Sequence, residues 1–221
     1  EKHLPEGKWG YHDYRDSDIN NYILAAERLA KLGHYAIRMG AAVKEKLDIN
    51  NPNIIDYATK GRTDFLDIYL AAKCRFFICD TAGVYGLSAI FRRPIAWVNF
   101  IPLEHAPTWG KDHLFIPKKL WVRKEKRLLT FKEIIESKIG RALDNSLYEK
   151  AGIEVIENTA QEIRDLAVEM AERLNGERHQ PQQDEELQLR FQRLFKPSEL
   201  NGVFFSRIGA EFLRQNRELL K

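Results

Sequence analysis

Apolar residues at two different spacings alternate along the first half of the chain. Helical spacing between Ile19 and Ala30 predicts a helix, with N-cap candidates at Asp16–Asp18 and an end at Gly33. Short apolar runs predict buried strands at residues 34–39, 53–57, 75–79 and 95–98, and helical patterns occupy residues 64–73 and 84–91. In the helix at 64–73 the spacing turns Phe65, Ile68, Tyr69 and Ala72 inward. This alternation predicts an α/β fold, a doubly wound and mostly parallel sheet covered on both faces.

The pattern is less regular after residue 100. Residues 101–127 are rich in Pro, Trp and Lys, and we expect a loop there. Two capping boxes, Thr130–Glu133 and Thr159–Glu162, predict helix starts. A strand is predicted at 153–156, a polar linker at 176–186, and two final helices marked by Leu187, Phe191, Leu194 and Phe195 and by Ile208, Phe212 and Leu213. We therefore expect a Rossmann-like domain at 1–175 and a helical extension at 176–221.

The polar segment Glu1–Tyr14 leads into the first helix with no strand ahead of it. A doubly wound domain begins with a strand. We therefore expect the first strand to lie upstream of residue 1.

Composition excludes several classes of protein. The chain has 221 residues and a net charge of +3, which is too weak to indicate a nucleic-acid partner. No run approaches the roughly 20 apolar residues of a membrane span and no leader pattern opens the chain, so a soluble cytoplasmic protein is expected. Cys74 and Cys79 fall on opposite faces of one predicted strand and are too few for a zinc site, and no metal is predicted.

One dense basic run, Lys118–Arg127, has two interpretations. It is either a solvated loop or a patch that holds the protein peripherally at an anionic membrane surface or an acidic partner. The second interpretation would place the protein at the inner face of the cytoplasmic membrane.

The turn Asp80–Gly83 is the first candidate for a binding site. It follows a predicted parallel strand, and ligands of such sheets bind beyond the carboxyl ends of the strands. Its backbone N–H groups and the Thr81 hydroxyl suit a phosphate. A helix terminus contributes only about 0.3 to 2 kcal/mol, whereas nucleotide binding requires roughly 4 to 8 kcal/mol. Further donors are needed, and we expect Arg38 beside Gly40 first, then Arg15 and Lys44.

Other polar residues have an ordinary interpretation beside a functional one. Asp56 and Tyr57 end a predicted strand and would bind a ribose or stack on a base, or they simply end the strand. Asp64 and Asp67 are better explained by the helix dipole than as general bases. His12 and His113 lie in predicted loops within reach of a crevice.

The familiar nucleotide and hydrolase motifs are missing from the sequence. It contains no G-x-G-x-x-G, no P-loop, no G-x-S-x-G and no H-E-x-x-H. Dehydrogenases and P-loop NTPases are therefore disfavoured.

The chain resembles the donor-binding C-terminal half of GT-B type glycosyltransferases, specifically a bacterial family assigned to surface-carbohydrate transfer, and more distantly heptosyltransferases and fucosyltransferases. The similar stretches cover nearly the whole chain: YHDYRDSDINNY, YAIRMG, NIIDYA, DFLDIYLAAKCRFFI, FRRPIAWVNFIPL, LFIPKKLW, LTFKEII, IENTAQEI and RIGAEFL.

The resemblance implies donor-diphosphate contacts at four residues of the turn, Thr81, Ala82, Gly83 and Val84. It also implies Arg38 and Gly40 in the cleft and Arg15 near the interdomain opening. The turn reads DTAGVYGL, with bulky Tyr85, where a serine or threonine followed by Gly and a small residue is expected, so the donor's identity stays open.

The function implied is transfer of a sugar from a nucleotide-sugar to a cell-surface glycan or lipid-linked acceptor, without a metal or other cofactor. An acceptor-binding N-terminal domain, and with it the general base, would lie outside these residues. Two alternatives remain open. One is a sugar-nucleotide epimerase of the same architecture, and the other is a non-catalytic nucleotide-binding or scaffold module.

Overall fold

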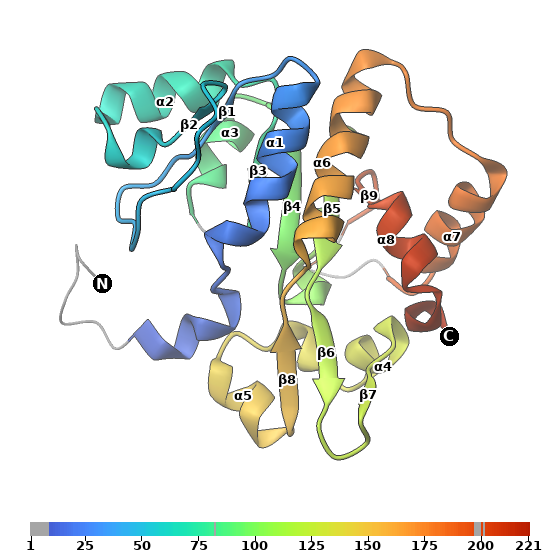
Figure 1. The fold of residues 1–221 in the computed structure, drawn as a ribbon. Coiled ribbons are helices and arrows are strands. Elements are labelled where there is room, and N and C mark those ends of the chain that lie inside the picture. The colour runs from blue at the N-terminus through green and yellow to red at the C-terminus, as the bar shows by residue number, and fades with distance from the viewer. Residues whose placement is uncertain (1–8, 82, 197–199, 201) are drawn as a thin grey trace.

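A parallel four-stranded sheet forms the centre of the computed structural model, which describes residues 9–81, 83–196, 200 and 202–221. The strand order is β3-β4-β5-β9, and all neighbouring pairs run parallel (Figure 1). The strands are β3 (Phe77–Cys79), β4 (Ile95–Phe100), β5 (Leu114–Pro117) and β9 (Arg207–Ile208). The predicted α/β class with a parallel sheet is confirmed, and the sheet is compatible with a Rossmann-like fold.

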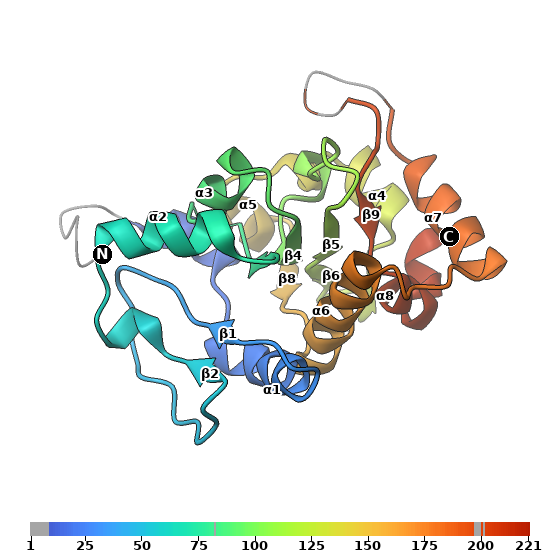
Figure 2. The ribbon, with the colours of Figure 1, turned by 90° about the horizontal axis from the view of Figure 1, so that it is seen from above.

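Helices cover both faces of this sheet. Seen from above, α1 (Ile23–Lys31) and α6 (Ala160–Asn175) lie on one side, and α2 (Asp64–Lys73) and α3 (Tyr85–Ile90) lie on the other (Figure 2). The predicted bounds of the α2 helix are confirmed. Both predicted capping boxes are also present, at the starts of α4 (Phe131–Glu136) and α6. The first predicted helix opens as a 3-10 turn, η2 (Ile19–Tyr22), capped by Asp18.

A separate pair of short strands stands beside the main sheet. β1 (Ala36–Ile37) and β2 (Ile54–Ile55) pair in parallel with each other, and neither pairs with β3 in the described residues. The predicted strands at 34–39 and 53–57 therefore exist, in shorter form.

The expectation of a loop over residues 101–127 is wrong. This stretch contains β5, then β6 (Lys119–Val122) and the start of β7 (Arg127–Leu128). The strand Leu114-Phe115-Ile116-Pro117 is fully buried, but it is too short and too close to lysines for its pattern to stand out. A single residue, Lys118, separates β5 from β6.

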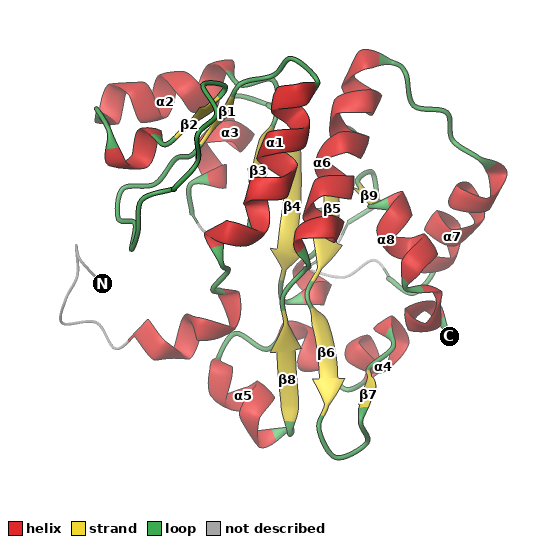
Figure 3. Ribbon diagram, viewed as in Figure 1, coloured by secondary structure: helices red, strands yellow, loops and turns green. Residues whose placement is uncertain are grey.

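A three-stranded antiparallel sheet, order β7-β6-β8, continues beyond the end of the parallel sheet (Figure 3). The predicted strand at 153–156 is β8 (Ile153–Ile156), and it pairs antiparallel with β6. Since it belongs to this second sheet, it does not extend the parallel one. Around these sheets lie η1 (Trp9–Arg15), η3 (Tyr57–Thr59), η4 (Leu103–His105), η5 (Ile139–Arg141) and α5 (Asn145–Lys150).

The C-terminal part is tied into the main sheet. It consists of α7 (Gln182–Gln192), β9, α8 (Ala210–Gln215) and η6 (Arg217–Leu220), and β9 pairs with β5. The linker predicted at 176–186 is partly wrong, because α7 begins at Gln182, ahead of its first apolar residue, Leu187. Ile208, predicted in a helix, lies in a strand.

The inward face predicted for α2 is also wrong. The exposed fractions of Phe65, Ile68 and Tyr69 are 71%, 48% and 48%. By contrast, all six residues of β4 are buried, and the core around β4 and β5 is filled by α6 through residues such as Ile163 and Met170. The buried apolar side chains are therefore concentrated around β4 and β5, whereas these three apolar side chains of α2 are exposed.

Candidate functional site

Polar residues follow three neighbouring parallel strands at the same edge of the sheet. Asp80 follows β3, Asn99 is the second-to-last residue of β4, and Lys118 follows β5. The carboxyl edge of a parallel sheet is the usual position of ligands in open α/β folds. This edge is therefore the candidate site.

Ser17 and Tyr22 bring the segment before α1 to Asp80. The Ser17 hydroxyl donates to Asp80 Oδ2 at 2.7 Å, and Ser17 Oγ lies 3.3 Å from the Tyr22 hydroxyl. Burial and then the charge of Asp80 raise the pKa of Tyr22 above its ordinary value, so this phenol stays protonated. Carboxylate and hydroxyl groups clustered in this way are suited to binding the hydroxyl groups of a ligand.

Lys118 places a cation at this edge. The residue is only 6% exposed, and its Nζ donates to the backbone carbonyl of Asp16 at 2.5 Å. Burial lowers the pKa of Lys118, while the nearby carboxylates of Glu157, Asp80 and Asp16 act in the opposite direction. The ammonium group is thus balanced by acids from three parts of the chain.

A buried asparagine pair joins β4 to the start of α6. The Asn99 N–H donates to Asn158 Oδ1 at 2.5 Å, the Asn158 N–H donates to Asn99 Oδ1 at 2.6 Å, and Asn158 Nδ2 donates to the Pro117 carbonyl at 2.9 Å. Asn99 has a left-handed backbone with φ of 52°, which asparagine tolerates better than most residues. The pair fixes the ends of β4 and β5 relative to α6.

A cavity of about 290 Å³ opens beside Lys118, between η1, α5 and β8. Its lining carries five carboxylates and two cations, Lys118 and Arg123; the carboxylates belong to Asp13, Asp16, Glu149, Glu154 and Glu157. This acidic lining suits a ligand rich in hydroxyl groups better than a free polyanion. The cavity beside Lys118 is therefore lined by more acidic than basic groups.

The turn after β3 supplies polar backbone but little helix dipole. Thr81 Oγ1 is buried without a hydrogen-bond partner among the described residues, and a side chain added at Gly83 would meet open space. Ala82 lies outside the described residues. Val84 precedes α3, which has only six residues and no side-chain cap, so its dipole is weaker than that of a longer helix. None of the described residues of the turn lines the 290 Å³ cavity.

Arg38 is engaged away from this turn. Its Nη1 donates to the Glu45 carbonyl at 2.7 Å and lies 3.4 Å from Asp56 Oδ1. Asp56 also accepts from Leu47 N and Thr59 Oγ1; burial raises the pKa of Asp56, but these bonds and Arg38 outweigh it, so the net shift is downward. Gly40, with φ of 148°, lies against Val43. Arg38 and Asp56 therefore form an ion pair with each other in the β1–β2 region.

The remaining predicted residues have local partners. The Tyr57 hydroxyl donates to the Thr63 carbonyl at 2.9 Å and lies 3.0 Å from Asp67, so this buried ring holds the start of α2. Arg15 lies over the Tyr14 ring and donates to the Tyr14 hydroxyl at 2.9 Å, on the cavity side of the molecule. Asp64 and Asp67 pair with Arg62.

The basic run is not a loop of free charges. Lys119 pairs with Glu162 at 2.8 Å, Arg127 contacts Glu125 and Glu133, and Lys124 and Lys126 stay exposed at the tip of the β6–β7 hairpin. Membrane contact through this tip stays a prediction.

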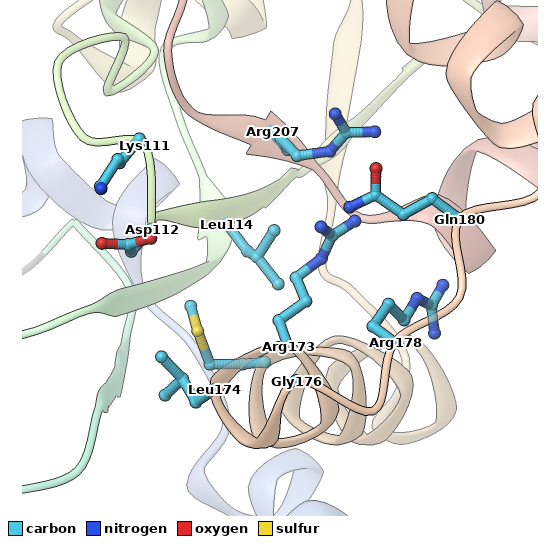
Figure 4. Close-up of a pocket in the computed structure, with 10 residues that line it drawn as sticks. Lys111, Asp112, Leu114, Arg173, Leu174, Gly176, Arg178, Gln180 and Arg207 are labelled. Atoms are coloured by element: carbon cyan, nitrogen blue, oxygen red, sulfur yellow. The ribbon is translucent and has the colours of Figure 1, made fainter.

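A second cavity, of about 220 Å³, lies at the opposite edge, where β5 and β9 begin. Arg173, Arg178 and Arg207 line it together with Lys111 (Figure 4). Each of these guanidinium groups already has a carboxylate: Arg173 with Glu169 at 2.9 Å, Arg178 with Glu172 at 3.0 Å and Arg207 with Glu185 at 2.5 Å. These pairs neutralise the arginines. Arg207 connects β9 to α7, and Arg178, which also lies 3.8 Å from Asp184, connects α6 to α7, so we assign this cavity a structural role.

Sequence reasoning missed most of the residues that gather at the carboxyl edge. Ser17, Tyr22, Asn99, Lys118 and Glu157 were not among the predicted site residues. The available signal is positional: Lys118 follows the run Leu114–Pro117, Asn99 follows the predicted strand 95–98, and Asn158 comes two residues after the strand 153–156. The loop predicted over residues 101–127 hides the position of Lys118 at a strand end.

The chain has no match among protein-family models, curated proteins or solved structures. Within the described ranges, no group of three or more His, Cys, Asp or Glu side chains is arranged to hold a metal ion. None of the helices in that part of the chain combines the length and apolar character of a membrane span.

Proposed function

We propose that this chain binds a nucleotide-sugar at the carboxyl edge of its parallel sheet, as the donor-binding half of a GT-B type glycosyltransferase. The observation that carries the proposal is the convergence of Asp80 and Lys118, from the ends of two strands of one sheet, with the Ser17 and Tyr22 hydroxyls. The sequence resemblance described above supports the same function.

Two groups of residues are assigned to two different parts of the proposed nucleotide-sugar. The turn after β3, with the Thr81 hydroxyl and the exposed backbone at Gly83, is assigned to the diphosphate. The carboxylates and hydroxyls around Ser17 and Asp80 are assigned to hydroxyl groups of the sugar or ribose. Lys118 is assigned to the charge that develops on the departing diphosphate, where a fixed cation lowers the barrier to transfer. The acceptor and the general base are left to residues outside this site.

Titration calorimetry with UDP, GDP, CDP and CMP tests the proposal. We expect one nucleotide to bind and Lys118→Met to weaken it by about 10-fold or more, the loss typical of a charge-assisted hydrogen bond. Lys111→Met is the matched control, because Lys111 is an exposed lysine at the opposite edge, and its affinity should equal that of the unmodified protein.

Absence of binding by all four nucleotides would reject the proposal and favour a scaffold role. If a nucleotide binds, incubation of the nucleotide-sugar without acceptor separates the activities. Formation of an epimer would identify the enzyme as an epimerase.

A further inference from the structure

Among the described residues, β3 pairs only with β4 and β1 pairs only with β2, so the second edge of each of these two strands has no strand partner there. In β1, the Ala36 and Arg38 N–H groups donate to the Asn53 and Ile55 carbonyls of β2. Since N–H groups alternate in direction along a strand, the Ile37 N–H and carbonyl face away from β2. In β3, Phe77 N–H donates to the Pro94 carbonyl beside β4, so the Ile78 N–H and carbonyl face away from β4.

Apolar side chains near these two edges are more exposed than is usual in parallel sheets. Strands of parallel sheets are normally buried on both faces. Here Ile37 is 38% exposed and Ile55 is 41% exposed, and Tyr35 beside them is 69% exposed. The stripe of α2 formed by Phe65, Ile68 and Tyr69 is exposed as well, on the sheet face opposite α1 (Figure 2). Uncovered surface thus lies on β1–β2 and on α2.

The order of the elements points to one missing strand. One sheet has the order β2-β1 and the other has β3-β4-β5-β9. A strand placed between β1 and β3 would give β2, β1, the added strand, β3, β4 and β5 the doubly wound order 3-2-1-4-5-6, with β9 beyond it. The helices agree with this order. A right-handed crossover from such a strand through α1 to β1 places α1 on one face, and the return from β2 to β3 places α2 on the other, as observed.

We propose that an extended apolar segment pairs in parallel with both β1 and β3 and joins them into one continuous sheet. The crossover through α1 assigns this segment to polypeptide directly ahead of Glu1, because the strand that pairs with the open edge of β1 is the one that leads into α1. The sequence of residues 1–8 contains Pro5, Gly7 and few apolar residues, and therefore lacks the apolar pattern of a buried strand. This inference stands independently of the proposed function.

The added strand would complete the candidate site. In the doubly wound order, the ligand crevice lies between strands 1 and 4, the point where the strand order reverses. These are the added strand and β3. The Asp80 turn and the Ser17 segment that binds it would then flank the crevice from its two sides.

Amide hydrogen exchange tests the proposal at single residues. The 221-residue chain is compared with the same chain carrying the residues that its gene encodes ahead of Glu1. We expect the Ile37 and Ile78 amides to exchange freely in the 221-residue chain and to gain protection of about 100-fold or more in the longer one. Arg38 and Phe77 are internal controls, since their N–H groups are already bonded and should be protected in both proteins.

Hydroxyl-radical footprinting gives a second, independent readout. Labelling of Phe65 and Tyr69 should fall in the longer protein, while Ile90, which is 74% exposed on α3, should be labelled equally in both. Free exchange of Ile37 and Ile78 in the longer protein, with Arg38 and Phe77 protected, would overturn the proposal. Protection of the same two amides in the 221-residue chain that increases with its concentration would assign the edges to a second copy and overturn the proposed occupant.

Discussion

The Ser17 hydroxyl donates a 2.7 Å hydrogen bond to Asp80 Oδ2, and the two residues are separated by 63 positions in the sequence. This bond connects the segment before α1 with the carboxyl end of β3. Because the Tyr22 hydroxyl lies 3.3 Å from the same serine oxygen, the three side chains form one connected group at the candidate site.

Replacing Ser17 by alanine tests how far this group is held together by its serine. Ser17→Ala removes the donor to a charged acceptor, and we expect the free energy of unfolding to fall by about 1 kcal/mol in urea titrations. Ser137→Ala is the control, because Ser137 bonds only within its own helix turn, to the Glu133 carbonyl at 2.6 Å and the Ile134 carbonyl at 3.3 Å. An equal loss in the free energy of unfolding in both variants would show that the bond from Ser17 to Asp80 stabilises the protein no more than a local helix-turn bond does.

The asparagine pair gives a larger expected effect. Asn99→Ala leaves the buried Asn158 N–H without its acceptor and places alanine in a left-handed backbone. We expect a loss of about 2 to 4 kcal/mol in the free energy of unfolding. Asn99→Gly removes the same bond without the backbone strain and should be less costly by about 1 kcal/mol. Two variants of equal stability would contradict the strain component.

Among the carboxylates that pair with the arginines of the 220 Å³ cavity, Glu169 is the one whose replacement is expected to lower stability most. It is 2% exposed, accepts from Arg173 at 2.9 Å, and accepts from the Ala210 N–H at the start of α8 at 2.8 Å. Glu169→Gln removes a buried counter-charge from the half-buried Arg173, and we expect a loss of about 3 kcal/mol by chemical denaturation. Glu172→Gln, at a 38% exposed side chain that pairs with Arg178, should cost less than about 1 kcal/mol. The opposite ranking would disprove this assignment.

His113 predicts a pH dependence of stability. Its Nδ1 accepts a hydrogen bond from the Ile95 N–H at 3.1 Å, and burial lowers the pKa of His113 to about 4, against a small opposing effect of Asp112. The folded protein therefore binds this proton less readily than the unfolded chain. Its contribution is complete above pH 6.5 and is lost as the pH falls toward 4, by about 3 kcal/mol in total.

The measurement for His113 is urea denaturation of the unmodified protein and His113→Asn at several pH values between 7 and 4. Asparagine retains an acceptor for the Ile95 N–H but does not titrate. The variant should therefore lose less stability than the parent on acidification. Parallel curves for the two proteins would exclude His113 as the source.

Local sequence signals predicted the elements whose stabilising contacts are also local. The capping boxes at Thr130 and Thr159 start helices as expected, because the bonds involved lie within three residues of each other. The bounds of α2 follow from its Thr63 cap and Lys73 end. The fold class followed from the alternation of such elements along the chain.

The candidate site depends on contacts that local signals do not encode. Arg38 was placed in the cleft from its position at a strand end, but its partners Asp56 and Glu45 lie in the β1–β2 region. The Pro-, Trp- and Lys-rich composition of residues 101–127 predicts a loop at Lys118, yet this residue is buried among the charges of Asp16, Asp80 and Glu157. The partners of Lys118 lie 38 or more positions away along the chain and can be identified only once the strands are arranged in space.

The single residue between β5 and β6 has a mechanical consequence. With Pro117 in one sheet and Lys119 in the other, the backbone at Lys118 has no slack, so its ammonium group is positioned by rigid framework on both sides. Lengthening or shortening the chain at this junction by one residue would reverse the inward and outward faces of everything that follows in β6, which makes the junction far less tolerant of insertions and deletions than the turn beyond Asp80.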